Sequence, residues 1–221
     1  MRLVKPNAHV ICKLPSEEVM RSIEVAGRVC YKSEDQITED SAEKFVRRLI
    51  QSGHESVIEH ISVSAVVICD RGVSHEIVRH RLASYSQEST RYCNYTRDKF
   101  GGEIVVIDPR SGIELDSHMK DLPQTNKDLI FDTWVVAMNH AEDAYHSILE
   151  LGATPQIARG VLPTALKTEM VMTMNLREWR HFLKVRTDKA AHPQIREIAL
   201  ELLSDFKSYL PIVFEDIPYV Y

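Results

Sequence analysis

Two segments, far apart in the chain, alternate apolar and polar residues and constrain the fold more than any other feature. Residues 61–69 (ISVSAVVIC) begin with this alternation and then become continuously apolar, whereas residues 166–174 alternate throughout. Because successive side chains of a strand point to opposite faces, a period of two predicts a strand with one buried face. Residues 103–107 (EIVVI) form a third apolar run of strand length. Isolated strands are not stable in water, so these segments must pair within a sheet.

Helical periodicity accounts for most of the remaining chain. Apolar residues recur every three or four positions, and residues that favour helix ends bound several of these stretches. Ser16 stands at an N-cap position, and Asn175 with Glu178 forms a capping box. Gly53 and Gly152 stand where C′ glycines end helices. These signals predict helices over 16–30, 40–53, 73–84, 126–151, 154–159, 175–185 and 193–206.

The order of these elements predicts an α+β fold. Strand and helix signals alternate irregularly, so we expect a central, mostly antiparallel sheet flanked by helices, with helical additions. The chain has 221 residues, a length that suits one domain, and it contains no linker, internal repeat or low-complexity tract. A single domain is therefore expected over residues 1–221. The methionines at alternate positions of residues 166–174 are expected in the core or at a subunit interface.

The composition excludes several classes of protein. Apolar residues make up 44% of the chain and charged residues 27%, and no apolar run approaches the roughly 20 residues of a spanning helix, so disorder and membrane spans are not expected. The net charge of −5 argues against a broad basic surface for nucleic acid, so any bound anion must meet local cations. Four scattered cysteines without a CxxC pair, and no secretory leader pattern, predict a reducing, cytoplasmic location.

The densest group of functional residue types spans residues 79–92. Three arginines, a histidine and several hydroxyl groups fall within this stretch, whose polar part, 84–92 (SYSQESTRY), is predicted to form a loop. Guanidinium groups bind phosphate in a bidentate way, and loop hydroxyls and amides supply further donors, so the pattern favours a site for a nucleotide-sized anion. The alternative without a function is a solvated helix end, where cations complement the helix dipole.

The same stretch contains one of four motifs that are spread along the chain. Residues 79–81 read RHR, and seven residues separate them from Ser89. Further blocks read GHES at 53–56, ARGVLP at 158–163, and NLR at the start of 175–186. In chain order, with GHES first, the blocks resemble the signature segments of the flavin-dependent thymidylate synthase family, and together they cover most of the chain, from about residue 53 to 196.

The resemblance implies a reductive methylation. dUMP would be methylated at C5 of the uracil to give dTMP, with 5,10-methylenetetrahydrofolate as carbon donor and NADPH as reductant through tightly bound FAD. It also implies a homotetramer whose active sites use residues from several subunits. It implies neither a metal, nor a nucleic acid partner, nor a membrane.

The resemblance also assigns roles to residues at matching positions. Those expected to contact FAD are Ser56, Arg79, His80, Arg81, Gln87, Asn175, Arg177 and His181. Those expected to contact dUMP are Glu76, Arg79, Gln87, Glu88, Ser89, Thr90, Arg91, Arg159 and Arg186. Arg91 and Arg159 would hold the 5′-phosphate. Arg186 is predicted to be catalytic, because a cation at the O2/N3 edge of uracil favours loss of the N3 proton and makes C5 nucleophilic.

Several of these residues, and the function as a whole, have alternative interpretations. Ser89 lacks an adjacent base, so it is expected to bind dUMP rather than act as a nucleophile. Cys93 is interpreted as a packed residue, although a cation two residues away could lower the pKa of its thiol. The histidines lack a metal-ligand spacing such as HExxH, so no metal is expected. The alternative function is a nucleotide- or RNA-binding module without catalysis, which would use residues 79–97 for stacking and phosphate contacts.

Overall fold

The structure, a computed structural model, describes residues 1–12 and 14–219. Its strands are β1 (Arg2–Val4), β2 (Asn7–Cys12), β3 (Ser62–Asp70), β4 (Ala83–Gln87), β5 (Val105–Ile107) and β6 (Lys167–Asn175). Its α-helices are α1 (Ser16–Val29), α2 (Ser41–Gln51), α3 (Arg71–Ile77), α4 (Arg110–Leu115), α5 (Gln124–Glu150), α6 (Pro155–Ala158), α7 (Leu176–Arg186), α8 (Pro193–Tyr209) and α9 (Pro211–Phe214). Short 3-10 segments are η1 (Glu34–Gln36), η2 (Glu55–His60), η3 (Asp98–Phe100) and η4 (Arg159–Val161).

The main sheet has the strand order β2-β3-β6-β4, and all its neighbouring strands are antiparallel. Its centre is the pair β3 and β6, which stay in register from Ser62 opposite Asn175 to Asp70 opposite Lys167. β1 and β5 form a separate parallel pair. The predicted α+β class with a mostly antiparallel sheet is confirmed. The two segments that alternate in sequence are the two central strands, whose faces are buried to different degrees.

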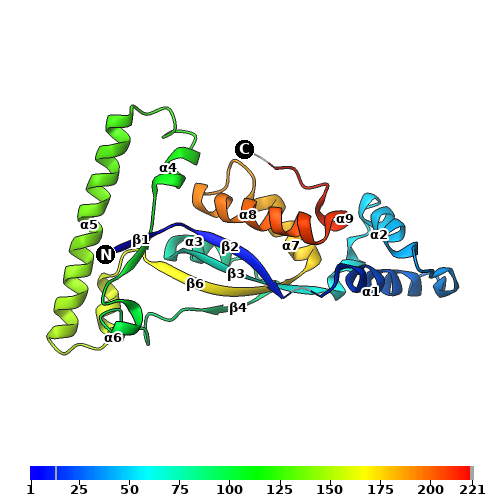
Figure 1. The fold of residues 1–221 in the computed structure, drawn as a ribbon, viewed down its shortest axis with the longest axis horizontal. Helices are drawn as coiled ribbons and strands as arrows, with labels where there is room; N and C mark the ends of the chain where they lie inside the picture. The colour runs from blue at the N-terminus through cyan, green and yellow to red at the C-terminus, as the bar shows by residue number, and fades with distance from the viewer. Residues whose placement is uncertain (13, 220–221) are drawn as a thin grey trace.

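The core lies between one face of this sheet and the helices α7, α8 and α9 (Figure 1). Met170, Met172 and Met174 of β6 are at most 2% exposed, and they pack in one cluster with Trp179 and Phe206, which are fully buried. The side chains at the intervening positions of β3 and β6 are mostly half-buried. The alternation in sequence therefore separates a core face from a face that stays partly open.

The chain after β3 is the part that differs most from the prediction. The helix predicted over 73–84 is present as α3, but its predicted end is wrong, because α3 ends at Ile77. The loop predicted over 84–92 is wrong in its first part, because β4 extends to Gln87. The Tyr85 hydroxyl donates to the carbonyl oxygens of Ile77 at 2.9 Å and His80 at 2.7 Å, which closes the turn between helix and strand. β4 pairs with β6, and local periodicity carries no signal for such a long-range contact.

Asn175, Gly53 and Gly152 lie at helix ends as predicted. The Asn175 side chain accepts a hydrogen bond of 2.9 Å from the N3 backbone N–H of α7, as an N-cap does. Gly53 and Gly152 have φ angles of 72° and 96°, the left-handed conformation of C′ glycines. The predicted start of α1 at residue 16 is confirmed, but the N-cap is Pro15, and Ser16 is the first helical residue.

The sequence did not indicate the edge strand β2. Its backbone N–H groups at Ala8 and Val10 donate to the carboxylates of Glu201, at 2.8 Å, and Asp205, at 3.0 Å, both on α8. Acidic side chains of a helix therefore satisfy donors that a further strand would otherwise satisfy. This edge depends on tertiary contacts, which explains why a local pattern does not reveal it.

Arg180 of α7 is a buried cation that connects three segments. It is 1% exposed, and its guanidinium donates to Glu55 of η2 at 3.1 Å and to both carboxylate oxygens of Asp216 at 2.7 Å each. It also donates to the backbone oxygen of Val213. A buried guanidinium is tolerated only when it is paired in this manner. α7 is thereby fixed both to the segment that precedes β3 and to the residues that follow α9.

α5 is a 27-residue helix that lies at one end of the molecule (Figure 1). Met138 and Tyr145 on it are buried in a second apolar cluster, with Ile104 and Val106 around β5. Other apolar side chains of the helix are open to solvent, among them Leu129, which is 67% exposed. Within residues 1–12 and 14–219, no helix is both long enough and apolar enough to cross a membrane.

Candidate active site

The RHR motif lies directly after α3, and its three side chains differ in burial. Arg79 and Arg81 are exposed, whereas His80 is 8% exposed. Among the described residues, neither guanidinium has a hydrogen bond or an ion pair. The motif therefore presents two cations to solvent and turns the imidazole inward.

His80 is held on several sides. Its Nε2 accepts a hydrogen bond of 3.0 Å from Nε of Arg186, and its Nδ1 lies 3.5 Å from a carboxylate oxygen of Glu178. The Phe182 ring packs edge-on against the imidazole, with 4.9 Å between the ring centroids. The backbone oxygen accepts the Tyr85 hydroxyl. Both ring nitrogens are thus directed at side chains of α7.

These contacts keep the imidazole neutral. Burial lowers the pKa of His80 to about 4, and the neighbouring Arg186 and His181 act in the same direction. Because Nε2 accepts the Arg186 N–H, the ring proton of the neutral form belongs on Nδ1, on the side of Glu178. His80 therefore offers a lone pair to Arg186 rather than a charge to a ligand.

Arg186, the predicted catalytic residue, ends α7 with its guanidinium fixed by three acceptors. Besides the bond to His80, Nη1 donates to the Glu76 carboxylate at 3.0 Å, and Nη2 donates to the Glu76 backbone oxygen at 3.3 Å. These bonds engage three of the five guanidinium N–H groups and leave two. A cavity of about 440 Å³ adjoins it, lined by Lys184, Val185, Arg186, Asp188, Ala190 and Ala191.

A second group of predicted residues is organised around Glu88, just after β4. Its two carboxylate oxygens accept hydrogen bonds from the Tyr95 hydroxyl at 2.9 Å and the Lys167 ammonium at 3.0 Å. Its backbone oxygen accepts one from Arg71 at 3.2 Å. Burial acts to lower the pKa of Lys167, but the hydrogen bonds that its ammonium donates to Glu88 and Glu169 outweigh burial and raise the pKa. Glu88 is therefore a fixed carboxylate that any ligand shares with these partners.

The Gln87 side chain turns inward. Its Nε2 donates to the hydroxyl oxygens of Ser74 at 3.0 Å and Thr168 at 3.1 Å. The amide nitrogen is therefore used within the fold, and the amide oxygen is the part of this side chain that can meet a ligand.

The two arginines expected to hold a phosphate lie on segments that pack together. Arg91 donates through Nε to Gln156 of α6 at 3.1 Å, and Arg159 donates through Nη1 to the Thr90 hydroxyl at 3.4 Å. Both arginine side chains are exposed. The Ser89 hydroxyl accepts the backbone N–H of Arg91 at 3.4 Å. Two cations from separate motifs thus meet at one surface.

A third group gathers where η2 meets the start of α7. Ser56 is exposed on η2, and the exposed Arg177 pairs with Glu59 of the same segment. Asn175 uses its side-chain oxygen as the N-cap of α7, which leaves its amide nitrogen for a ligand. The exposed His181 lies one turn further along α7, with its ring centroid 5.8 Å from that of the RHR histidine.

Neither candidate nucleophile is activated. The Ser89 hydroxyl contacts the backbone N–H of Arg91 rather than a basic side chain. Burial and the Glu88 carboxylate raise the pKa of the Cys93 thiol, so it stays protonated at neutral pH. Ser89 therefore suits a binding role and Cys93, which packs against the second apolar cluster, a packing role, rather than covalent catalysis.

Three residues have the spacing of a metal site. His80, Glu178 and His181 place one ligand atom each within 4.8 Å of one another. The Arg186 guanidinium, bonded to the same imidazole, puts a fixed positive charge beside that position. Repulsion by this charge disfavours a divalent cation, so the cluster suits an anionic or aromatic ligand better.

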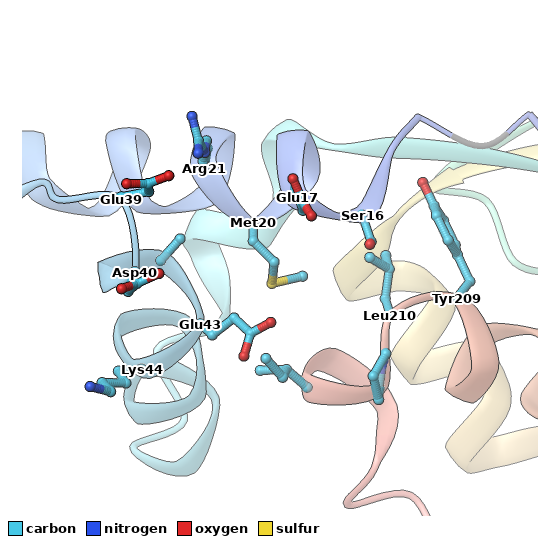
Figure 2. Close-up of a pocket in the computed structure, with 13 residues that line it drawn as sticks. Ser16, Glu17, Met20, Arg21, Glu39, Asp40, Glu43, Lys44, Tyr209 and Leu210 are labelled. Atoms are coloured by element: carbon cyan, nitrogen blue, oxygen red, sulfur yellow. The ribbon is translucent and has the colours of Figure 1, made fainter.

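A cavity of about 510 Å³ lies away from the predicted site residues, none of which lines it. Figure 2 shows it between α1, α2 and the C-terminal residues, with Met20 and Leu210 among its apolar lining. Its four carboxylates, Glu17, Glu39, Asp40 and Glu43, outnumber its two cations, Arg21 and Lys44. An acidic lining repels phosphorylated ligands, so cavity size alone does not locate the site.

Sequence reasoning missed three residues that hold the predicted ones in place. Lys167 and Tyr95 fix the Glu88 carboxylate, and Glu178 faces His80. A lysine within an alternating strand was the available signal for Lys167. Glu178 was interpreted as a capping residue, and its backbone has that role, but its side chain points elsewhere.

The buried imidazole predicts an acid sensitivity. The pKa of His80 is about 4 in the folded chain and about 6.5 when unfolded, so the unfolded state binds a proton first as the pH falls. The stabilisation is therefore complete above pH 6.5 and is lost toward pH 4, by about 3 kcal/mol. Urea unfolding at pH 5 and 7 should give a smaller difference for His80→Gln than for wild type. Equal differences would contradict the assignment.

Fold and site together define a class of α+β proteins with exposed arginines around a buried, neutral histidine and a fixed guanidinium, an arrangement suited to phosphorylated ring compounds. Residues 14–212 match the family described as thymidylate synthase complementing protein. The flavin-dependent thymidylate synthase of Mycobacterium bovis is 35% identical to this chain over 201 residues, which cover 88% of this chain and 78% of the relative. That of Geobacter sulfurreducens is 33% identical over 202 residues, which cover 88% of this chain and 80% of the relative. The chain belongs to the flavin-dependent thymidylate synthase family. It is an enzyme of that family, and the resemblance drawn from its motifs is confirmed.

A solved structure has the same fold. The crystal structure of the UMP/dUMP methylase PolB from Streptomyces cacaoi, bound with 5-Br dUMP, superimposes with a TM-score of 0.79 at 23% sequence identity. The likeness covers 97% of this chain and 96% of that one. The helices added around the sheet, α5 included, therefore belong to the shared fold.

Proposed function

We propose that this enzyme methylates dUMP to dTMP, with 5,10-methylenetetrahydrofolate as carbon donor and NADPH as reductant through bound FAD. The observation that carries the proposal is the Arg186 guanidinium, which His80 and Glu76 hold in one orientation with two N–H groups left for a substrate. The names of the mycobacterial and Geobacter relatives support the same reaction. We assign it to one domain spanning residues 1–221 and to the cytoplasm.

Arg186 acts on the uracil ring in this proposal. A fixed cation against the O2/N3 edge stabilises the negative charge that develops as N3 loses its proton, and so lowers the pKa of N3. The electron-rich ring is then nucleophilic at C5. Because His80 and Glu76 already orient the guanidinium, little reorganisation is needed during the reaction.

The nucleotide phosphate would lie at the surface shared by Arg91 and Arg159. Both guanidinium groups are exposed, and each has only one hydrogen-bonded partner among the described side chains, so donors remain for phosphate oxygens. The hydroxyl groups of Ser89 and Thr90 would donate further hydrogen bonds to the phosphate. Glu76, Gln87 and Glu88 would bound the path from this surface to Arg186.

The flavin would contact the remaining predicted residues. Arg79 and Arg81 are exposed cations, which suits a diphosphate, and the amide nitrogen of Asn175 suits a ring edge. The other members of this set are Ser56, His80, Gln87, Arg177 and His181. When bound, FAD supplies the hydride chemistry that NADPH drives.

The direct test is to purify the protein and record its visible spectrum. We expect flavin absorbance, either as purified or after reconstitution with FAD. NADPH oxidation should then depend on dUMP and methylenetetrahydrofolate, with dTMP as product. A protein that cannot be loaded with FAD, or that forms no dTMP when loaded, would refute the proposal.

Arg91→Ala is expected to weaken dUMP binding rather than the chemical step. A hydrogen bond between charged groups contributes about 1.5–3 kcal/mol, so KM for dUMP should rise about 10–100-fold with a smaller change in kcat. Arg48→Ala, which removes an exposed arginine of α2, is the matched control for lost charge. Steady-state kinetics with varied dUMP measures both constants. An unchanged KM would remove Arg91 from the phosphate site.

We also propose that the active unit is a homotetramer with shared sites. The groups at Asn175 and at Lys167 stand at opposite ends of β6, which spans roughly 26 Å at the usual rise per residue. The two polar groups of one chain are therefore far apart. In an oligomer, the group at the Lys167 end of one chain can lie beside the group at the Asn175 end of a second chain. The half-open sheet face and the exposed apolar residues of α5 leave surface for such contacts.

Light scattering measures the mass of the assembly. Assemblies that mix two impaired variants test whether one active site uses residues from different subunits. Arg91→Ala and Arg177→Ala alter groups at the two ends of β6. When the two variants are unfolded together and refolded, mixed assemblies assayed at dUMP well below the raised KM of Arg91→Ala should be more active than either variant refolded alone. A monomer with full activity would contradict the proposal.

A further inference from the structure

Glu178 has a structural explanation in its backbone but not in its side chain. It is the N3 residue of α7, and its N–H donates to the Asn175 side chain at 2.9 Å. In a full capping box the N3 carboxylate returns to the N-cap N–H. Here the carboxylate oxygen instead lies 3.5 Å from Nδ1 of His80, and the Glu178 side chain is only 11% exposed.

The contact faces a histidine whose other nitrogen is already committed. Nε2 of His80 accepts the Nε–H of Arg186 at 3.0 Å, so this nitrogen must be unprotonated. A neutral imidazole then carries its single proton on Nδ1. A carboxylate is only an acceptor, and therefore it favours the ring form with a proton on the nitrogen that it faces.

We propose that Glu178 is a positioning residue that holds the proton of His80 on Nδ1 and so fixes the guanidinium of Arg186. The inference rests on the proposed function, in which that guanidinium polarises the uracil. In the opposite ring form, Nε2–H and the Arg186 N–H would be two donors facing each other, and the guanidinium would lose one of its three acceptors. Glu76 alone would then orient it.

The surroundings of His80 leave few other groups to set its ring form. His181 of α7 is exposed, its ring centroid is 5.8 Å from that of His80, and one of its ring nitrogens lies within 4.8 Å of the His80 and Glu178 ligand atoms without a hydrogen bond to His80. Phe182 offers no acceptor. The Tyr85 hydroxyl is engaged with backbone oxygens. Glu178 is therefore the carboxylate that faces Nδ1, at 3.5 Å.

Two variants separate this role from an effect of charge on the helix. Glu178→Ala removes both the charge and the acceptor, whereas Glu178→Gln removes the charge but keeps an oxygen that can accept from Nδ1. We expect kcat to fall at least about tenfold in Glu178→Ala and to be largely retained in Glu178→Gln, with KM for dUMP changing little in either. Glu43→Ala is the matched control, because Glu43 occupies the same N3 position in α2.

The proton itself can be followed in protein labelled with ¹⁵N-histidine. The His80 signal is identified by its absence in His80→Gln, and in the wild type it should show Nδ1 protonated and Nε2 unprotonated. Glu178→Ala should shift the population toward Nε2–H, and Glu178→Gln should resemble the wild type. A wild-type proton on Nε2, an unchanged signal in Glu178→Ala, or equal kcat losses in both variants would overturn the role of Glu178. Full turnover by Arg186→Ala would instead overturn the proposed function and leave the proton result intact.

Discussion

Arg186→Ala is expected to lower kcat for dTMP formation by about 10²–10³-fold, the usual cost of removing a pre-oriented donor that stabilises developing charge. The loss should fall on kcat because the guanidinium is already fixed by His80 and Glu76, so its contribution is greatest when negative charge develops on the uracil. FAD binding should persist, since Arg79, Arg177 and the other predicted flavin residues are untouched.

Two further variants sharpen this prediction. Arg186→Lys keeps the charge, but one ammonium cannot reproduce the planar fork that contacts His80, the Glu76 carboxylate and the Glu76 backbone oxygen, so most of the loss should remain. Lys189→Ala removes an exposed cation shortly after α7 and should have little effect. dTMP is quantified in single turnovers with FAD-loaded enzyme, and turnover within a few-fold of wild type by Arg186→Ala would refute its catalytic role.

Trp179→Ala is expected to destabilise the protein by about 4 kcal/mol. The ring is fully buried, packs tilted against Phe206 with 4.9 Å between centroids, and donates through Nε1 to the backbone oxygen of Val63 at 2.9 Å. Its removal leaves a cavity and an unpaired buried carbonyl oxygen, both of which cost free energy of unfolding. Trp179→Phe keeps most of the packing and should cost only about 1–2 kcal/mol.

The second tryptophan of the chain provides the control. Trp134 lies half-buried on α5, so Trp134→Ala removes the same atoms from a ring that already contacts water, and its cost should be clearly smaller. Urea unfolding followed by circular dichroism measures the three variants. Equal losses for the two alanine variants would show that burial under α8 does not account for the stability that Trp179 contributes.

The fold was predictable where a local pattern is itself the cause of the structure. The alternation in β3 and β6 separates a core face from an open face, and Asn175, Gly53 and Gly152 satisfy or end helix backbones through their own chemistry. The strands β2 and β4 were not predicted, because each is stabilised by partners distant in sequence. β2 uses carboxylates of α8, and β4 uses β6.

The candidate site likewise has a part that the sequence predicted and a part that it did not. The motifs identified the residue types, the family and Arg186 as a candidate, because side-chain chemistry is written in the sequence. They did not indicate that His80 turns inward while Arg79 and Arg81 stay exposed. Nor did they indicate that Lys167 and Tyr95 hold Glu88.

The sequence by itself determined the strands of the sheet centre, the capped helices and the cationic groups available for an anion, since each depends on residues close together in the chain. Only the tertiary structure decided which of these groups are fixed and which stay free. Packing α7 against the segment that follows α3 makes Arg186 share His80 with Glu178, and packing α6 against the turn after β4 brings Arg91 and Arg159 to one surface. Hydrogen-bond direction and burial depend on both partners, and a single chain segment contains only one of them.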